Sequence, residues 1–316
     1  MSTSGGFRAV IAALLANLGI AASKFVAFFF TGSSSMLSEG MHSIADSGNQ
    51  VLLLMGRKRA QRAATEEHPF GYGRSRYVYA FIVSIVLFCL GGVFALYEGW
   101  HKIAHPEKLN SPIWAFCVLV VAMMLEGFSL RTAAKESNQL RGSAPWSRFV
   151  RGAKAPELPV ILLEDVGALV GLLFALAGVT VTVITGDGRW DGIGSLAIGI
   201  LLVFIAIFLA LEMNSLLIGE SAAAEHVAAI RSALQAGSDI ERIIHLKTLH
   251  LGPDELMVVA KIAVRHDETA SSIARAIDSA ESRIRSAVPI ARVIYLEPDI
   301  FRKPAPPPKR DKGVKD

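Results

Sequence analysis

The sequence has few cysteines and few charged residues. Its two cysteines, Cys89 and Cys117, both lie inside apolar stretches, so they form no disulfide framework of the kind that holds small secreted domains together. Only 19% of the residues are charged, whereas 52% are hydrophobic, and the mean hydropathy is +0.43. This balance is too apolar for an ordinary soluble domain and indicates an integral membrane protein.

Motifs of several other functional classes are missing as well. The chain contains no His-Glu-x-x-His sequence and no nucleophile with an adjacent base, which argues against an intramembrane protease. Its pI is near 9.1, but the basic residues flank apolar stretches and lack interleaved aromatics that could stack on bases, so nucleic acid is not an expected partner. The first apolar stretch lacks a small-residue cleavage site and is interpreted as an uncleaved anchor.

Apolar stretches of about 20 residues recur along the first two thirds of the chain, each long enough to cross a hydrocarbon core of about 30 Å. They predict six membrane spans, at 7–30, 33–56, 77–100, 112–132, 156–183 and 193–218. Lys and Arg residues concentrate in the connections after the second and fourth stretches. By the positive-inside rule both termini are expected in the cytosol, and the expected location is a bacterial inner membrane.

After residue 218 the pattern changes to that of a soluble domain. Helix and strand signals alternate there in the order αββαβ, at Glu220–Gln235, Arg242–Leu251, Glu255–Val264, Asp267–Ala287 and Ala291–Glu297. This order predicts a small cytosolic α+β domain at 219–300, whose open sheet surface is expected to mediate dimerisation. The basic, Pro-rich segment 301–316 is predicted to be disordered.

Ionisable residues inside the second and fifth stretches are the main functional signal. A charged group at the centre of a membrane costs roughly 2.5 to 3.5 kcal/mol on insertion scales, so by default it marks an ion or substrate path. The fifth stretch contains Glu164 and Asp165 side by side. In the second stretch, four polar side chains recur at intervals of 3, 4 and 3 residues and therefore share one helical face: Glu39, His42, Asp46 and Asn49.

The two groups lie at matching depths in the membrane. If the second span starts at the outer surface near Ser33, the midpoint of His42 and Asp46 lies roughly 16 Å inside, at 1.5 Å per residue. If the fifth span starts at the inner surface near Pro156, Asp165 lies roughly 14 Å from that surface. Across about 30 Å of hydrocarbon these depths coincide near the midplane, so a shared site is predicted.

The shared site would supply an imidazole and two carboxylates to a divalent cation. His42, Asp46 and Asp165 provide three ligands, and Zn²⁺ takes a fourth at about 2.0–2.2 Å. The fourth is predicted to be Glu164 or water, with two alternatives on the second span, Asn49 and Glu39.

Two further charged residues in the predicted spans receive a structural interpretation. Lys24 lies in the first span and Glu126 in the fourth, each without a second ionisable group in sequence register. Lone polar residues in membrane bundles commonly hold helices together or balance charge. Packing or charge balance is therefore favoured over metal ligation for both.

Four segments of the sequence form a recognisable set together with the six spans and the αββαβ tail. On these segments the chain resembles the cation diffusion facilitator family of divalent-metal transporters over nearly its whole length. The segments are Gly32-Ser-Ser-Ser-Met-Leu-Ser-Glu followed by His42-Ser-Ile-Ala-Asp46, the loop His68-Pro-Phe-Gly-Tyr-Gly-Arg74, Asp165 in the fifth span, and Asp191-Gly-Ile-Gly-Ser195 at the start of the sixth.

The resemblance implies a fold and a function. The fold would be an α-helical membrane protein of six transmembrane helices with a cytosolic α+β ferredoxin-like (αββαβ) C-terminal domain, assembled as a Y-shaped or V-shaped homodimer. The function would be export of a divalent metal from the cytosol in exchange for protons, with His42, Asp46 and Asp165 as the transport site. The metal would be transported rather than kept as a resident cofactor.

One departure from the family pattern concerns the choice of metal. Many members have a His four residues before the fifth-span Asp, whereas this chain has Ile161 there and Glu164 next to Asp165. The pair resembles a branch of the family with Glu-Asp in this position. Because one nitrogen ligand is lost, the donor set is harder, so zinc is the first prediction but manganese, iron and cobalt stay open.

The resemblance implies two accessory metal sites, in the loop after the second span and in the tail, and this sequence lacks some of the histidines expected at each. The loop has His68 and Tyr72 where relatives often have two histidines, and the interpretation favoured there is a solvated turn. In the tail, Ser271 or Ser272 and Tyr295 stand where many relatives have histidines, so no regulatory metal site is expected. Two histidines of the first tail strand, His245 and His250, are interpreted as structural.

Two functional hypotheses follow. The first is a secondary active transporter, not an enzyme, in which metal and protons compete for the same imidazole and carboxylate atoms. The alternative is a membrane scaffold or metal sensor that keeps the fold but does not transport. Metal flux distinguishes them.

Overall fold

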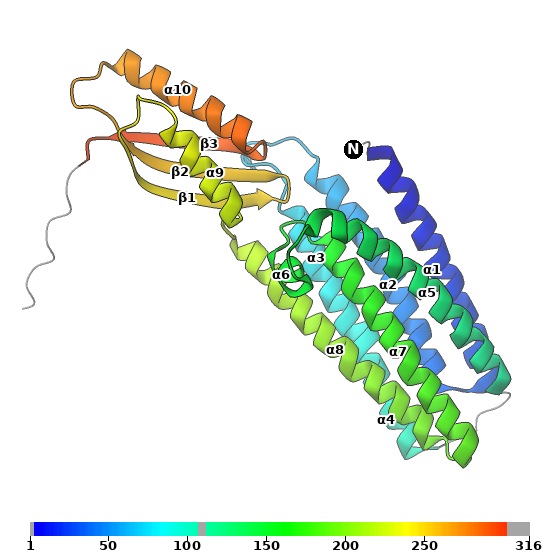
Figure 1. The fold of residues 1–316 in the computed structure, drawn as a ribbon. Helices are drawn as coiled ribbons and strands as arrows, with labels where there is room; N and C mark the ends of the chain where they lie inside the picture. Colours follow the sequence, from blue (N-terminus) through cyan, green and yellow to red (C-terminus); the bar gives the residue numbers. More distant parts are fainter. Residues whose placement is uncertain (1–2, 107–111, 302–316) are drawn as a thin grey trace, which may run out of the picture. The chain divides into compact units, whose positions relative to one another are not determined.

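The computed structural model describes residues 3–106 and 112–301. It separates into two compact units, the first formed by the residues up to Glu220 with the turn Leu251–Asp254, and the second by Ser221–His250 and the residues from Glu255 on. The first unit is built from helices, whereas the second combines helices with a small sheet (Figure 1). Apart from Phe301, the tail for which disorder is predicted lies outside the described residues.

The long helices of the first unit coincide with the predicted spans to within a few residues, and most extend further. The third predicted span is continuous but contains a π-helical segment between two α-helices. The described helices are α1 (Thr3–Thr31), α2 (Ser34–Ala60), α3 (Ser75–Val86), η1 (Leu87–Val93), α4 (Phe94–Ala104), α5 (Pro112–Arg141), the short α6 (Trp146–Gly152), α7 (Glu157–Thr185) and α8 (Arg189–Ile218).

Four helical segments within the described residues are long and apolar enough to cross a membrane: Ser75–Ala104, Ile113–Asn138, Glu157–Thr185 and Arg189–Ile218. Helix α1 contains a shorter apolar segment, Asn17–Thr31. Helix α2 has sufficient length but contains the polar stripe. The protein is therefore an integral membrane protein, and the crossing of the membrane by α1 and α2 stays a prediction.

Helix α2 tolerates its polar residues because other helices surround it. It contacts α1, α3, α7 and α8, and its long buried face includes the whole polar stripe from Glu39 to Asn49. A polar side chain that faces neighbouring helices can be satisfied by protein groups, which lipid cannot provide.

The start of α2 is held to the start of α8 by Asp191, whose side chain is fully buried. The Ser33 hydroxyl donates to Asp191 Oδ1 at 2.8 Å, and the Ser34 backbone N–H donates to Oδ2 at 2.7 Å. The Ser35 hydroxyl donates to Oδ1 at 2.5 Å. The three serines at the start of α2 and the aspartate at the start of α8 are thus explained by one hydrogen-bonded contact between the two helices.

Replacing Asp191 by alanine should destabilise the helical unit. Each buried donor that loses its acceptor costs roughly 1–3 kcal/mol, and the joint contains several. We expect a clear loss of thermal stability of Asp191→Ala in detergent, measured by unfolding of the purified protein. The exposed carboxylate of Glu136 provides the matched control, because Glu136→Ala should leave the unfolding temperature close to wild type. An equal shift in both variants would contradict this role of Asp191.

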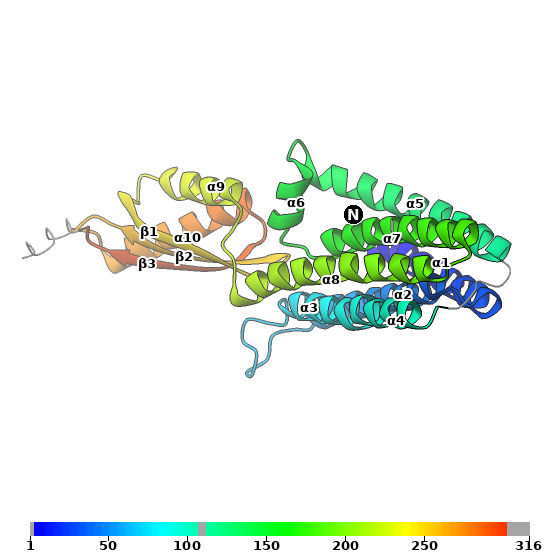
Figure 2. The same ribbon diagram turned by 90° about the horizontal axis from the view of Figure 1, so that it is seen from below.

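Helices α3 and α4 pack closely against α8, as Figure 2 shows from a second direction. Glycines permit this approach: a Cβ atom on Gly99 would lie 2.7 Å from the Gly192 carbonyl oxygen, and one on Gly92 would lie 2.6 Å from Val203 Cγ2. The π-helical segment also places Gly91 beside His42, since a Cβ there would lie 3.8 Å from His42 Nδ1. Isolated π turns are frequent at functional sites.

The second unit has the αββαβ order that the sequence predicts. Its elements are α9 (Ala224–Gln235), β1 (Arg242–Gly252), β2 (Glu255–Ala263), α10 (Ala270–Ala287) and β3 (Ala291–Asp299). The strands pair in the order β1-β2-β3, with β2 and β3 parallel and Val258 opposite Ile294.

Alternate residues of β2 form the core of this unit. Leu256, Val258, Ala260 and Ile262 are buried and pack in one cluster with Ile230 of α9 and Ile284 of α10. The period of two places these side chains on one sheet face, and the two helices contact each other over it. The ferredoxin-like type of the domain, its limits at 219–300 and its role in dimerisation stay predictions.

Candidate metal centre

The first half of the candidate site is a turn of α2. His42 is fully buried and Asp46 is 6% exposed. His42 Nε2 lies 3.5 Å from Asp46 Oδ2. The spacing of four residues places both side chains on the same face of the helix, as the sequence predicts.

The second half lies on α7, which contacts α2. Both acidic residues are buried and each accepts a hydrogen bond from a neighbouring helix. Asn49 Nδ2 of α2 donates to Glu164 Oε1 at 2.7 Å, and Ser129 Oγ of α5 donates to Asp165 Oδ2 at 3.0 Å. The Asn49–Glu164 bond joins the two helices one turn from Asp46.

The α2 half and the α7 half of the candidate site lie next to each other, but their side chains do not surround a common point as metal ligands would. The Asp46 carboxylate interacts electrostatically with Glu164 and Asp165. Within the described residues, however, no three His, Cys, Asp or Glu side chains converge on one point with metal-ligand geometry. The assignment of His42, Asp46, Asp165 and Glu164 as ligands therefore stays a prediction.

Unsatisfied polar atoms at this place fit a cation. Among the described residues, both ring nitrogens of His42, Asp46 Oδ1 and Asn49 Oδ1 are buried without a hydrogen-bond partner. Buried polar atoms without partners are uncommon, and each one requires an explanation. Imidazole nitrogens and carboxylate or amide oxygens are ordinary ligands of divalent metals, so a transported ion would satisfy them.

Glu39, one of the alternative fourth ligands, is already occupied by a partner. Lys24 Nζ of α1 donates to Glu39 Oε2 at 2.9 Å and to Ser43 Oγ at 2.8 Å, and both charged side chains are fully buried. This buried ion pair accounts for Lys24 as a charge-balancing residue, which agrees with the interpretation favoured from the sequence. The other oxygen of Glu39, Oε1, is buried without a hydrogen-bond partner, so the choice of fourth ligand between Glu164, water, Asn49 and Glu39 stays a prediction.

Glu126 of α5 is 4% exposed and lies within the electrostatic reach of both halves of the site. Its carboxylate interacts with Lys24 and Glu39 on one side and with Asp46 and Asp165 on the other. The structure therefore places Glu126 among the ionisable groups rather than in unrelated packing.

Two hydrogen bonds at the site, from Ser129 and from Asn49, could not be predicted from the sequence. Ser129 is a single hydroxyl in an otherwise unremarkable part of α5, and only the packing of α5 on α7 reveals that it orients Asp165. Asn49 was recognised as a member of the stripe, but its bond to Glu164 depends on the relative rotation of two helices.

The loop between α2 and α3 does not gather a metal site in the described residues. The ring of His68 packs edge-on against Tyr72, with centroids 4.6 Å apart. The His68 backbone N–H and carbonyl both bond to Thr65, which closes a turn. The contacts describe a closed turn, and the absence of a metal site in this loop stays a prediction.

A cavity of about 520 Å³ lies among α5, α6, α7 and α8. Its described lining is apolar apart from Ser147 and Arg151, and it includes Leu163 and Phe208. An apolar lining offers no ligands to a hydrated cation, so this cavity is a poor path for metal.

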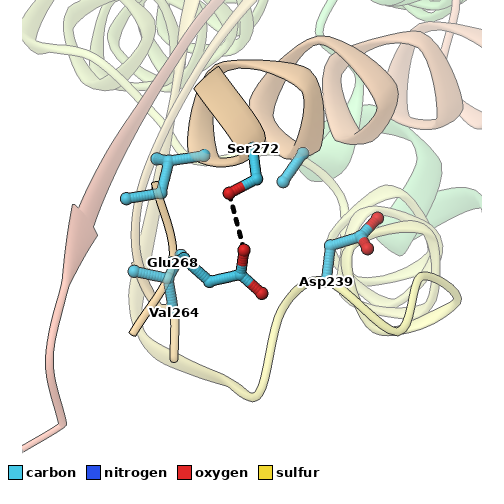
Figure 3. Close-up of a pocket in the computed structure, with 6 residues that line it drawn as sticks. Asp239, Val264, Glu268 and Ser272 are labelled. Carbon is cyan, nitrogen blue, oxygen red and sulfur yellow. Dashed lines mark hydrogen bonds between the residues drawn. The ribbon is translucent and has the colours of Figure 1, made fainter. Parts of the chain in front are cut away.

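Figure 3 shows the surroundings of Ser272 in the second unit, which with Ser271 is one of the two tail serines at which no metal ligand is expected from the sequence. Ser272 Oγ donates to Glu268 Oε2 at 2.6 Å, and these residues line a small cavity of about 30 Å³ together with Asp239. Tyr295 is exposed and His250 is buried. No described group here has the ligands of a metal site, although the absence of a regulatory metal stays a prediction.

Comparison with known proteins identifies the class. A model of the cation efflux transmembrane domain matches residues 10–218, which is about two thirds of the chain and includes both halves of the candidate site. The chain therefore belongs to the cation efflux family of membrane transporters, also called the cation diffusion facilitators, as its motifs predict.

Several curated proteins are similar to the chain. A mouse (Mus musculus) protein named mitochondrial proton-coupled zinc antiporter SLC30A9 is 32% identical over 76% of this chain and 42% of its own length. Metal tolerance protein C4 of Arabidopsis thaliana is 29% identical over 81% of this chain and 56% of its own length. The magnetosome protein MamB of a Magnetospira species is 22% identical over 86% and 90%. The chain thus spans less than half of the mouse relative.

Proposed function

We propose that this protein exports a divalent metal cation from the cytosol in exchange for protons. The observation that carries the proposal is the set of buried nitrogen and oxygen atoms without a hydrogen-bond partner on His42, Asp46 and Asn49, next to two acidic residues of α7. The name of the mouse relative, a proton-coupled zinc antiporter, supports the same activity.

The ion would be held by His42 and Asp46 from α2 and by Asp165 from α7. Glu164 is the proposed fourth ligand, with water as the alternative, because it lies next to Asp165 on α7 and the Asp46 carboxylate interacts electrostatically with both. Ser129 and Asn49 act as positioning residues: their hydrogen bonds fix one oxygen of Asp165 and one of Glu164. Such outer contacts commonly determine how well a ligand binds.

Exchange follows from the chemistry of the ligands. A metal requires a neutral imidazole and ionised carboxylates, so protons and metal compete for the same atoms. A free imidazole titrates near pH 6.5, which lies within the range of cellular pH gradients. A proton gradient directed inward would therefore favour release of metal on the acidic side.

Zinc is the proposed substrate, and manganese, iron and cobalt are the alternatives. The relatives named for zinc favour the first. One imidazole with several carboxylates is a harder donor set than a site with two histidines, which favours the others. The chain has Ile161 where a second histidine would add a nitrogen, so competition among metals is the decisive measurement.

The proposed location is a bacterial inner membrane, with both termini in the cytosol. The basic connections after α2 and α5 support this orientation. The mouse relative is named as mitochondrial, so the kind of membrane is not decided by similarity. We also propose a homodimer, because the second unit has a three-stranded sheet with helices over one face.

Transport in proteoliposomes tests the function directly. With purified protein and an imposed pH gradient, we expect uptake of Zn²⁺ that depends on the gradient and collapses when a protonophore removes it. Parallel assays with Mn²⁺, Fe²⁺ and Co²⁺ rank the substrates. Protein-free liposomes provide the baseline. If none of the four metals moves while the purified protein still binds them, the scaffold or sensor alternative is favoured instead.

A further inference from the structure

The C-terminal end of α4 presents two histidines side by side, His101 in the last turn and His105 at the C-cap that follows Ala104. His101 and His105 are four residues apart, both are exposed, and their ring centroids are 5.0 Å apart with the ring planes at 33°. The Tyr97 ring stacks on His101 from the other side, with centroids 6.2 Å apart and planes at 26°. The arrangement is thus a short aromatic column with two imidazoles at its end.

This pair lies at the end of the helical unit that is away from the basic connections. Lys102, between the two histidines in sequence, turns inward and donates to the Gly32 carbonyl oxygen at the end of α1, 2.9 Å away. One turn earlier, Gly99 packs against Gly192 at the start of α8. In the proposed orientation this end faces the compartment that receives the metal.

The chemistry of the pair is that of a metal chelate. Two histidines four residues apart on a helix are a recurrent arrangement for binding Zn²⁺, and here the C-cap position of His105 still leaves its ring centroid 5.0 Å from that of His101. Because the Lys102 ammonium group points inward to the Gly32 carbonyl, it does not extend along the histidine side chains, where its positive charge would repel a cation.

We propose that His101 and His105 form a second divalent-metal site, separate from the membrane site of α2 and α7. Water would complete the coordination, because two protein nitrogens leave open positions on a tetrahedral ion. A site with few protein ligands binds weakly and exchanges quickly, which suits an ion that has just left the membrane. Metal binding by this pair does not depend on the proposed transport. A role in receiving metal released from the membrane site rests on the proposed function.

The test is metal binding by the full chain in detergent, in a background that lacks the membrane site. In Asp46→Ala/Asp165→Ala protein, equilibrium dialysis with Co²⁺ and with Zn²⁺ should show one residual weak site. Replacing either histidine by glutamine, as His101→Gln or His105→Gln, should weaken that site by at least the roughly 10–100-fold that the loss of an outer-shell partner costs. The visible spectrum of bound Co²⁺ should lose its imidazole-dependent bands in both variants.

The exposed His266 of the second unit provides a matched control, because His266→Gln removes an imidazole without touching α4. Residual binding that is unchanged in His101→Gln and His105→Gln, or that falls equally in His266→Gln, would overturn the proposal. The two proposals fail separately: metal binding by the pair can be measured without any flux, and flux can be lost in Asp46 variants while the pair still binds.

Discussion

Asp46→Asn should abolish metal flux while the protein stays folded. The amide has nearly the shape of the carboxylate but has no negative charge, and the orphaned Oδ1 of Asp46 is one of the atoms that a metal would satisfy. Loss of an outer-shell partner alone costs roughly 10–100-fold in metal affinity, and a direct ligand should cost at least as much. The measurement is the initial rate of Zn²⁺ uptake into proteoliposomes under a fixed pH gradient.

Two comparisons make this prediction sharp. Asp165→Asn should have the same effect, because it removes the carboxylate from the other half of the site. Asp187→Asn, a change to a half-exposed carboxylate in the connection before α8, should keep wild-type flux. Wild-type rates in both Asp46→Asn and Asp165→Asn would show that the ion passes elsewhere, and unfolding temperatures measured beside the rates would separate loss of transport from loss of fold.

The helices of the membrane unit could be predicted from the sequence because they are long apolar runs between polar connections. The stripe on α2 could also be predicted, since intervals of 3, 4 and 3 place Glu39 and Asn49 on the face of His42 and Asp46 whatever surrounds the helix. The strands of the second unit follow from alternation, as the buried side chains of β2 illustrate. Helix span, helix face and strand alternation depend on residues close together in the chain, so the residue pattern predicts them.

The contacts between helices could not be predicted in the same way, because they depend on rotation and sliding in three dimensions. The bond from Ser129 to Asp165 joins residues 36 positions apart, and the bond from Ser33 to Asp191 joins residues 158 apart. The π-helical segment that places Gly91 beside His42 has no clear signal in an apolar sequence. Matching depths along two helices do not indicate which oxygen faces which partner.

The partner of Glu39 illustrates how the structure refines the site. From the sequence, Glu39 is one more acid on the stripe and a candidate ligand. In the structure it is bound to Lys24, which interacts electrostatically with His42 and Asp46 as well. A fixed positive charge near several acidic side chains reduces their mutual repulsion when no metal is bound. The pair therefore bears on the stability of the empty protein rather than on ligation.

Lys24→Met should strongly destabilise the protein. Both charged groups are fully buried, so the variant leaves the Glu39 carboxylate without its counter-charge and the Ser43 hydroxyl without its donor. Removing one partner of a buried ion pair typically costs about 3–5 kcal/mol. We expect a loss of this order in the free energy of unfolding, measured by denaturant titration of the purified protein in mixed micelles.

The double variant Lys24→Met/Glu39→Gln distinguishes a charge effect from a packing effect. Because it removes both charges, it should recover most of the stability that Lys24→Met loses, and the double-mutant cycle should give a coupling energy well above the roughly 0.5 kcal/mol expected for independent sites. Lys58→Met, at an exposed lysine near the end of α2, controls for the loss of any one positive charge. If the double variant were as unstable as Lys24→Met, the lost hydrogen bond from Lys24 to Ser43 or a change in packing would explain the instability, and the electrostatic account of this pair would be wrong.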